Sequence, residues 1–160
     1  MSQLKFLLST GKIIALDGKP IDSDVLMNKV LLIVNVASRC GLTPQYKQLV
    51  QLQNAFADRG FSVVGVPCNQ FGRQEPDTPT RIQQFCSHNY GVNFPLLEKQ
   101  DVNGVTRSPL YEWLVGTGED ISWNFGKFLV SANGEVLHRF ASNDSPDSRK
   151  IVLAIQEALA

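Results

Sequence analysis

The sequence lacks the features that mark several special classes of protein. Its 160 residues carry 15 basic and 15 acidic side chains, so there is no excess of positive charge for a nucleic-acid partner. No apolar run approaches the roughly 18 residues of a membrane span, and the opening MSQLKFLLSTGK has too short an apolar stretch for a secretory signal. We therefore expect a cytoplasmic protein that neither inserts into membranes nor binds nucleic acid.

Cysteine and histidine are also scarce. The three cysteines form no obvious disulfide scaffold, and in a reducing compartment they indicate either reactivity or plain burial. His88 and His138 are the only histidines, and neither has the spacing of a zinc ligand, so we predict no metal and no cofactor. With 43% hydrophobic residues, the chain has the composition of an ordinary globular protein. We expect it to form one domain over residues 1–160.

Apolar runs of strand length alternate with helical patterns along the chain. Residues 30–37 and 61–66 are continuously apolar, as in strands that are covered on both faces. This order predicts a thioredoxin-like α/β fold with a central mixed sheet flanked by helices and a short N-terminal β-hairpin addition. The other predicted elements are a hairpin arm at 12–16, hairpin strands at 125–130 and 135–140, and helices at 78–89 and 108–115. Two more helices are predicted with Thr43 as N-cap before Pro44, and with Ser145 as cap before Pro146.

The stretch NVASRCGLTPQY, residues 35–46, places a single cysteine where a buried strand gives way to a helix. Unpaired N–H groups and the helix dipole at such a junction favour negative charge, and Arg39 adds a neighbouring cation. A free thiol is only a few per cent thiolate at neutral pH. A position of this kind can lower the thiol pKa by a unit or more, and this favours reactivity at Cys40. Burial as a small apolar filler is the other interpretation, and the junction alone does not decide. Thr43 stands where a Cys-x-x-Cys motif has its second cysteine, which disfavours a dithiol shuttle and suits attack on a small electrophile.

Attack of a thiolate on a hydroperoxide also requires hydrogen-bond donors for the departing oxygen, and few carboxylates nearby. Two later stretches offer neutral donors: PCNQFGRQEP at 67–76 contains Gln74, and WNFGKF at 123–128 contains Trp123 and Asn124. Open α/β sheets place their sites in loops of this kind, which follow strand ends. Each residue also has a structural interpretation: Trp123 as core, Asn124 as a turn residue and Gln74 as surface.

Taken together, the three stretches resemble the signature segments of the glutathione peroxidase family, in the same order. The likeness runs from about residue 31 to residue 140 and includes FPLLEKQDVNG at 94–104. The resemblance implies the thioredoxin fold and makes Cys40 the peroxidatic nucleophile. It makes Gln74, Trp123 and Asn124 the rest of a catalytic tetrad, with Gln70 in the same loop as a fallback for Gln74.

The resemblance extends to the way an oxidised Cys40 is reset. Cys86, in RIQQFCSHNYGVNF, resembles the resolving cysteine of thioredoxin-dependent members, although the sequence alone favours an ordinary helix thiol. Cys68 is interpreted as structural. A Cys40–Cys86 disulfide needs Cα atoms within about 7 Å, so we expect the helix around Cys86 to loosen on oxidation. Only nine residues separate Trp113 from Trp123, without the insertion that builds a subunit interface in tetrameric relatives, and this resembles monomeric, phospholipid-hydroperoxide-type members.

The sequence therefore predicts a monomeric thiol peroxidase that reduces hydrogen peroxide and organic or lipid hydroperoxides. Thioredoxin is the first choice of reductant and glutathione the second. A peroxide sensor that passes its disulfide to a partner protein uses the same chemistry and is an alternative. A third interpretation, a non-catalytic thioredoxin-fold binding protein, is disfavoured by the conjunction of the thiol with the signature donors.

Overall fold

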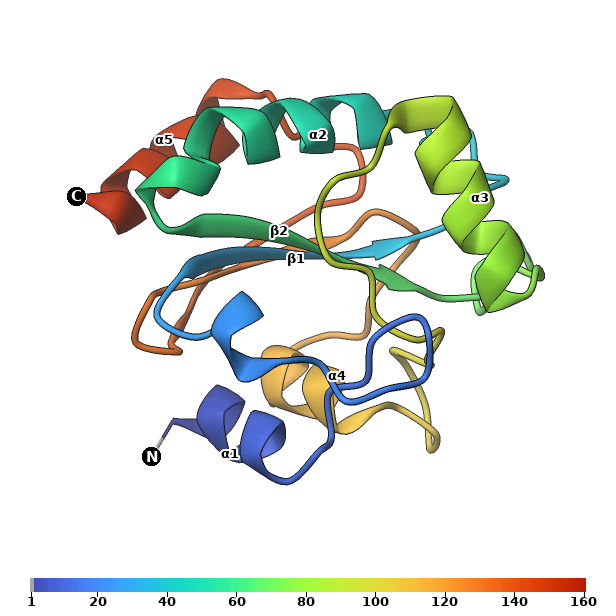
Figure 1. Cartoon of the computed structure of the whole chain (residues 1–160), viewed down its shortest axis with the longest axis horizontal. Helices are drawn as coiled ribbons and strands as arrows, with labels where there is room; N and C mark the ends of the chain where they lie inside the picture. The colour runs from blue at the N-terminus through green and yellow to red at the C-terminus, as the bar shows by residue number, and fades with distance from the viewer. Residues whose placement is uncertain (1) are drawn as a thin grey trace.

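The computed structural model describes residues 2–160 and has a thioredoxin-like α/β fold built on one mixed sheet (Figure 1). Its strands are β1 (Val30–Val36), β2 (Phe61–Pro67), β3 (Lys127–Val130) and β4 (Val136–Phe140), in the spatial order β2-β1-β3-β4. β2 is parallel to β1, whereas β3 is antiparallel to β1 and β4 to β3. The predicted fold class is confirmed.

Helices cover both faces of this sheet. They are α1 (Gln3–Ser9), α2 (Gln45–Phe56), α3 (Pro79–Tyr90), α4 (Pro109–Val115) and α5 (Arg149–Leu159), with short 3-10 helices at Ser23–Val25 and Ala57–Arg59. Figure 1 shows α2 and α5 on one face and α1 and α4 on the other. Leu32 and Val34 of β1 face the first layer, and Leu31 and Ile33 face the second. A strand with a hydrophobic layer on each side needs apolar residues at every position, which explains the continuous run in the sequence.

The predicted starts of the helices at 78–89 and 108–115 are confirmed. Thr78 caps α3 by accepting from the Arg81 N–H, and Ser108 caps α4 by accepting from the Tyr111 N–H, both at 3.3 Å. In each case proline follows the cap, where its missing N–H costs nothing. Gly91 ends α3 in the left-handed conformation at φ 58°.

Two predictions near the ends of the chain differ from the structure, and one helix was not predicted. α5 begins at Arg149 with Ser148 in the cap position, because the segment that starts at Ser145 forms a separate turn. The N-terminal hairpin is reduced to a single antiparallel bridge between Ile14 and Pro20. The sequence analysis also missed α1, a seven-residue helix whose apolar pattern is too short to distinguish from a loop.

The start of α2 also differs, because α2 begins at Gln45 with Pro44, not Thr43, in the cap position. The Thr43 hydroxyl is engaged elsewhere, in the loop that precedes the helix. Among residues 2–160, no helix has the length and apolar content needed to cross a membrane.

Candidate active site

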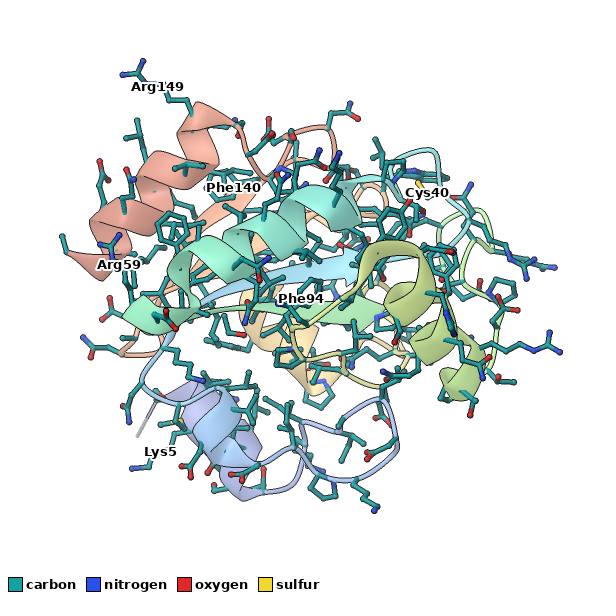
Figure 2. All side chains as sticks on the ribbon, turned by 45° about the horizontal axis from the view of Figure 1, so that its top comes forward. Lys5, Cys40, Arg59, Phe94, Phe140 and Arg149 are labelled. Carbon is teal, nitrogen blue, oxygen red and sulfur yellow. The ribbon has the colours of Figure 1, made fainter. Side chains whose placement is uncertain are left out.

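The loops that carry the predicted site residues meet at one edge of the sheet. The last residues of the parallel strands β1 and β2, Val36 and Pro67, are partners across the ladder. Lys127, the first residue of the antiparallel strand β3, lies opposite Val34 and so starts at the same edge. The loops that leave β1 and β2 and the loop that enters β3 therefore converge. Figure 2 shows Cys40 at this edge, by the N-terminal end of α2.

Cys40 occupies a tight turn between β1 and α2 and is 8% exposed. The Thr43 hydroxyl closes the turn by accepting from the Cys40 N–H at 2.9 Å and donating to the Ala37 carbonyl at 2.8 Å. The Leu42 N–H donates to the Cys40 sulfur at 3.3 Å. The Cys40 sulfur therefore accepts a backbone hydrogen bond at the junction between β1 and the loop before α2.

Gln74 and Asn124 are joined across 50 residues of sequence, since Asn124 Nδ2 donates to Gln74 Oε1 at 2.9 Å. Asn124 is fully buried, so its amide orients Gln74. With its oxygen engaged, the Gln74 amide presents its N–H groups to other acceptors. The Trp123 ring and the same amide flank Gly72, because a Cβ built on Gly72 would be 3.3 Å from both side chains. Trp123 itself is 37% exposed, which contradicts its interpretation as a core residue.

Arg39 links the Cys40 turn to the Gln74 loop through its backbone, because its N–H donates to the Gln74 carbonyl at 3.1 Å. Its guanidinium binds both carboxylate oxygens of Asp77, at 2.9 and 3.0 Å. Arg39, the cation next to Cys40 in the sequence, is therefore paired with the Asp77 carboxylate. Backbone and side-chain amides supply the donors in this part of the site.

The turn that carries Trp123 is strained and is held by specific hydrogen bonds. Phe125 adopts φ 68°, a left-handed conformation that is rare for an aromatic residue. Its N–H donates to the Asn35 carbonyl at 2.6 Å, and Lys127 Nζ donates to its carbonyl at 2.6 Å. Asn35 Nδ2 also donates to the Trp123 carbonyl at 3.0 Å. Such contacts offset the cost of a strained backbone, which is about 1–3 kcal/mol.

Lys127 is a buried cation that the sequence analysis did not assign to the site. Besides Phe125, its Nζ donates to the carbonyls of Ala141 and Ser142 at 3.4 and 3.3 Å. Desolvation lowers the pKa of Lys127 to about 8, although Asp144 opposes this effect. A lysine inside the apolar run GKFLV was the available signal, because a charge in a buried strand requires a partner.

Glu75, next to Gln74, contradicts the expectation of a site poor in carboxylates. Its side chain is fully buried, and neither carboxylate oxygen has a hydrogen-bond partner within residues 2–160. Burial raises the pKa of Glu75 from its ordinary 4.5 to about 7, and Ser38 and Lys99 lower it only in part. Burial therefore favours the protonated form of Glu75.

Gln70, the fallback for Gln74, points to another part of the molecule. Its Oε1 accepts from the N–H groups of Val102 and Asn103 at 2.8 and 3.0 Å, and its Nε2 donates to the Asn103 carbonyl at 2.9 Å. All its polar atoms are thus engaged with this loop. Gln74, not Gln70, shares the Asn124 and Trp123 contacts.

The two remaining cysteines are free and buried. Cys86 lies on α3 in the core, and desolvation raises its pKa to about 11, with the Tyr46 hydroxyl lowering it and Glu75 raising it further. Burial also raises the pKa of Cys68, which packs under the opposite face of the sheet. Neither thiol is ionised in this form of the protein at neutral pH. Within residues 2–160, no cluster of three or more His, Cys, Asp and Glu side chains could hold a metal ion.

Comparison with known proteins shows the family to which this chain belongs. Residues 8–115 match the glutathione peroxidase family model. The chain belongs to the glutathione peroxidase family. It is 56% identical to the hydroperoxy fatty acid reductase Gpx2 of Synechocystis sp., over 90% of this chain and 94% of that protein. It is 41% identical to the thioredoxin/glutathione peroxidase BtuE of Escherichia coli, over 91% and 93% of the two chains. The crystal structure of Trgpx in apo form has a TM-score of 0.75 and 34% identity, covering 99% of this chain and 96% of that one.

As a member of the glutathione peroxidase family, the protein is a peroxidase oxidoreductase. Its three signature segments are the three loops that meet at the sheet edge. Asn35 and Lys127 hold the loop that carries Trp123 through hydrogen bonds to the Trp123 and Phe125 carbonyls.

Proposed function

We propose that Cys40 is the peroxidatic thiol and that Gln74 and Trp123 donate hydrogen bonds to the oxygen that leaves. The observation that supports this proposal is the Asn124–Gln74 hydrogen bond, because it commits the Gln74 oxygen and leaves its N–H groups to donate elsewhere, with the Trp123 ring on the other side of Gly72. Asn124 is fully buried, so it acts by orienting Gln74.

In the first step the Cys40 thiolate attacks the nearer oxygen of the hydroperoxide. The S–O bond forms as the O–O bond breaks, so the sulfur is oxidised to a sulfenic acid and the peroxide is reduced by two electrons. The second oxygen leaves as hydroxide or alkoxide and takes a proton to become water or an alcohol. Neutral N–H donors in fixed positions stabilise the charge that develops on it without raising the pKa of a nearby thiol.

In the second step Cys86 resolves the sulfenic acid. Its sulfur displaces the hydroxyl group of Cys40, a disulfide forms, and the Cys86 proton leaves with the hydroxyl group as water. α3 is suited to the required movement, because only Ile82 and Cys86 among its twelve residues are buried. The high pKa of Cys86 in the folded helix keeps it as an unreactive thiol until α3 opens.

A dithiol or two monothiols must then return two electrons and two protons to the disulfide. Thioredoxin is the proposed reductant, with glutathione second, which agrees with the name of the BtuE relative. Hydrogen peroxide and organic or lipid hydroperoxides are the proposed substrates, in line with the name of Gpx2. We propose a monomer, because only nine residues separate Trp113 from Trp123. We also propose that it works in the cytoplasm, because free cysteines fit a reducing compartment.

The test is peroxide consumption by the wild type, Cys40→Ser and Cys86→Ser, measured separately with thioredoxin and with glutathione. Cys40→Ser should abolish both activities. Cys86→Ser should lose sustained turnover with thioredoxin but still form one sulfenic acid per molecule, which a dimedone label and mass spectrometry detect. Normal cycling of Cys86→Ser with thioredoxin would show that Cys86 is not the resolving residue. Oxidation of the wild type without sustained turnover would instead favour the peroxide sensor.

A further inference from the structure

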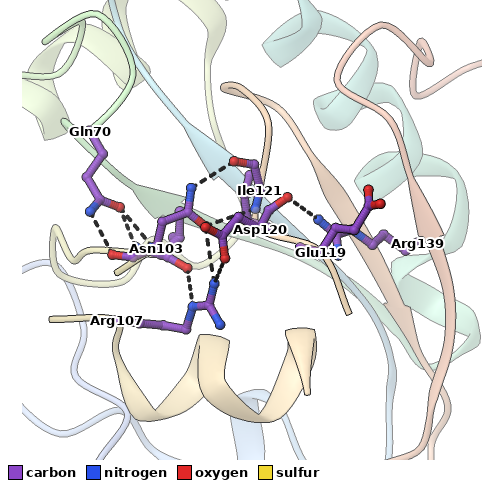
Figure 3. Close-up of polar contacts among 8 residues, drawn as sticks. Gln70, Asn103, Arg107, Glu119, Asp120, Ile121 and Arg139 are labelled. Carbon is purple, nitrogen blue, oxygen red and sulfur yellow. Dashed lines mark hydrogen bonds and ion pairs between the residues drawn. The ribbon is translucent and has the colours of Figure 1, made fainter. Parts of the chain in front are cut away.

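The segment that leads to Trp123 has no regular secondary structure and depends on side chains from elsewhere. Residues 119–122 are neither helix nor strand, although Ile121 is buried. Figure 3 shows the polar contacts around this segment. Arg139 donates to the carbonyls of Glu119 and Asp120 at 2.6 and 2.9 Å, which fixes its first part to β4. A second set of bonds fixes the part nearest to Trp123.

Asn103 makes a paired contact with the backbone of Ile121, two residues before Trp123. Its Nδ2 donates to the Ile121 carbonyl at 2.7 Å, and its Oδ1 accepts from the Ile121 N–H at 2.9 Å. The side chain thus binds one residue as a neighbouring strand would, with both ends of its amide engaged. Two bonds of opposite sense define both the position and the rotation of this peptide group.

Asn103 is in turn fixed to the loop that contains Gln74. Gln70, four residues before Gln74, holds the Asn103 backbone through three hydrogen bonds between 2.8 and 3.0 Å that involve Val102 and Asn103. Arg107 adds a bond to the Val102 carbonyl at 2.7 Å. Asn103 therefore bridges the Gln74 loop and the Trp123 loop, in addition to the direct Gln74–Asn124 bond.

We infer that Asn103 is a positioning residue for the peroxide step, and that it sets where the Trp123 indole stands relative to the Gln74 amide. This inference rests on the proposed function, since it concerns the donors for the departing oxygen. Donors of this kind act through fixed geometry, and a displacement of about 1 Å can cost about 100-fold in rate. Removing the Asn103 fastening of the Trp123 loop, while the other hydrogen bonds of the loop remain, should cost about 10-fold in the rate of Cys40 oxidation.

The experiment compares two reactions of the Cys40 thiol at the same pH. Oxidation by hydrogen peroxide requires stabilisation of the departing oxygen, whereas alkylation by iodoacetamide releases iodide and requires no such donor. Both rates are measured at Cys40 by mass spectrometry, for the wild type, Asn103→Ala and Asn93→Ala. The control removes the same kind of side chain from an exposed position, where its amide donates to Asn54 Oδ1 at 2.8 Å in the wild type. We expect Asn103→Ala to lower the ratio of oxidation to alkylation about 10-fold and the control to leave it within twofold.

The Asn103→Asp variant adds a readout that general destabilisation does not predict. Its new side chain keeps an oxygen for the Ile121 N–H, but it can donate to the Ile121 carbonyl only when the carboxyl group is protonated. Arg107 favours the carboxylate form, because its Nη2 lies 3.4 Å from Asn103 Oδ1, although the same guanidinium also pairs with Asp120. The ratio of oxidation to alkylation should therefore recover toward the wild-type value only as the pH falls below about 4, the ordinary pKa of an aspartate. This variant also decides the question if Asn103→Ala does not fold.

The inference is overturned if the ratio of the two rates is unchanged in both variants, or if oxidation and alkylation fall together. A loss in Asn103→Asp that does not depend on pH would also overturn it. Failure of the proposed function has a different signature, because wild-type Cys40 would then be alkylated but not oxidised by the peroxide.

Discussion

Replacing Glu75 with glutamine should change how the stability of the protein depends on pH. The carboxyl group is buried without a hydrogen-bond partner among residues 2–160, and its pKa is raised from 4.5 to about 7. The folded state therefore holds the proton more tightly than the unfolded state. Below pH 4.5 both states are protonated and no penalty arises; between pH 4.5 and about 7 only the unfolded state loses the proton, so stability falls as pH rises.

The size of the effect follows from the raised pKa. At about 1.4 kcal/mol per pH unit, the change from 4.5 to about 7 corresponds to about 3 kcal/mol of unfolding free energy, which is fully lost above pH 7. Glu75→Gln has no charge to bury. Relative to the wild type, its unfolding free energy should rise by about 3 kcal/mol between pH 4.5 and pH 8. For a chain of this length, that difference corresponds to roughly 6–12 °C in melting temperature.

The assay is urea-induced unfolding of the wild type and Glu75→Gln at several values between pH 4.5 and pH 8. Taking the difference between the two proteins removes the contribution of every other titrating group. Glu157→Gln is the matched control, because the same charge is removed from an exposed position on α5, where substitutions usually change stability by less than about 0.5 kcal/mol. A wild-type and Glu75→Gln difference that is constant over this range would refute the reasoning.

Two further predictions concern the loops at the sheet edge. The pKa of Lys127 is lowered from 10.5 to about 8, so the folded state favours the neutral amine and stability should rise as pH increases from about 8 to 10.5. Lys127→Met should lose this rise when urea unfolding is compared at pH 7.5 and pH 10, and an unchanged slope would exclude the assignment. Gly72→Ala should lower the rate of Cys40 oxidation by about 10-fold and stability by about 1 kcal/mol, because Gly72 has φ 65° and a Cβ there would press on Gln74 and Trp123 at 3.3 Å. Stopped-flow oxidation and thermal melting measure the two effects, and wild-type values for both would contradict the geometry.

Local sequence was sufficient where a structural element depends on nearby residues. Thr78 and Ser108 begin helices because each cap bonds an N–H three residues later, and the sequence contains both partners. Thr43 has the same local sequence signal but a different role, because its hydroxyl bonds Cys40 and Ala37 inside a turn. The Thr43 hydroxyl could bond either to the start of α2 or to the turn before it. Which of the two it binds depends on where β1 places that turn, and this is not encoded in the nearby residues.

The sequence by itself determined the alternation of buried strands and helices, the fold class and the three segments that carry Cys40, Gln74 and Trp123. Apolar periodicity and turn residues act over a few positions, so they can be recognised without the rest of the chain. Only the tertiary structure decided which polar side chains support those segments. Gln70 faces Asn103, and Glu75 is buried beside Gln74, because strands distant in sequence bring their loops to one edge of the sheet. Burial and hydrogen bonding between distant segments set the charge and direction of a polar group, and neither is encoded by its immediate neighbours.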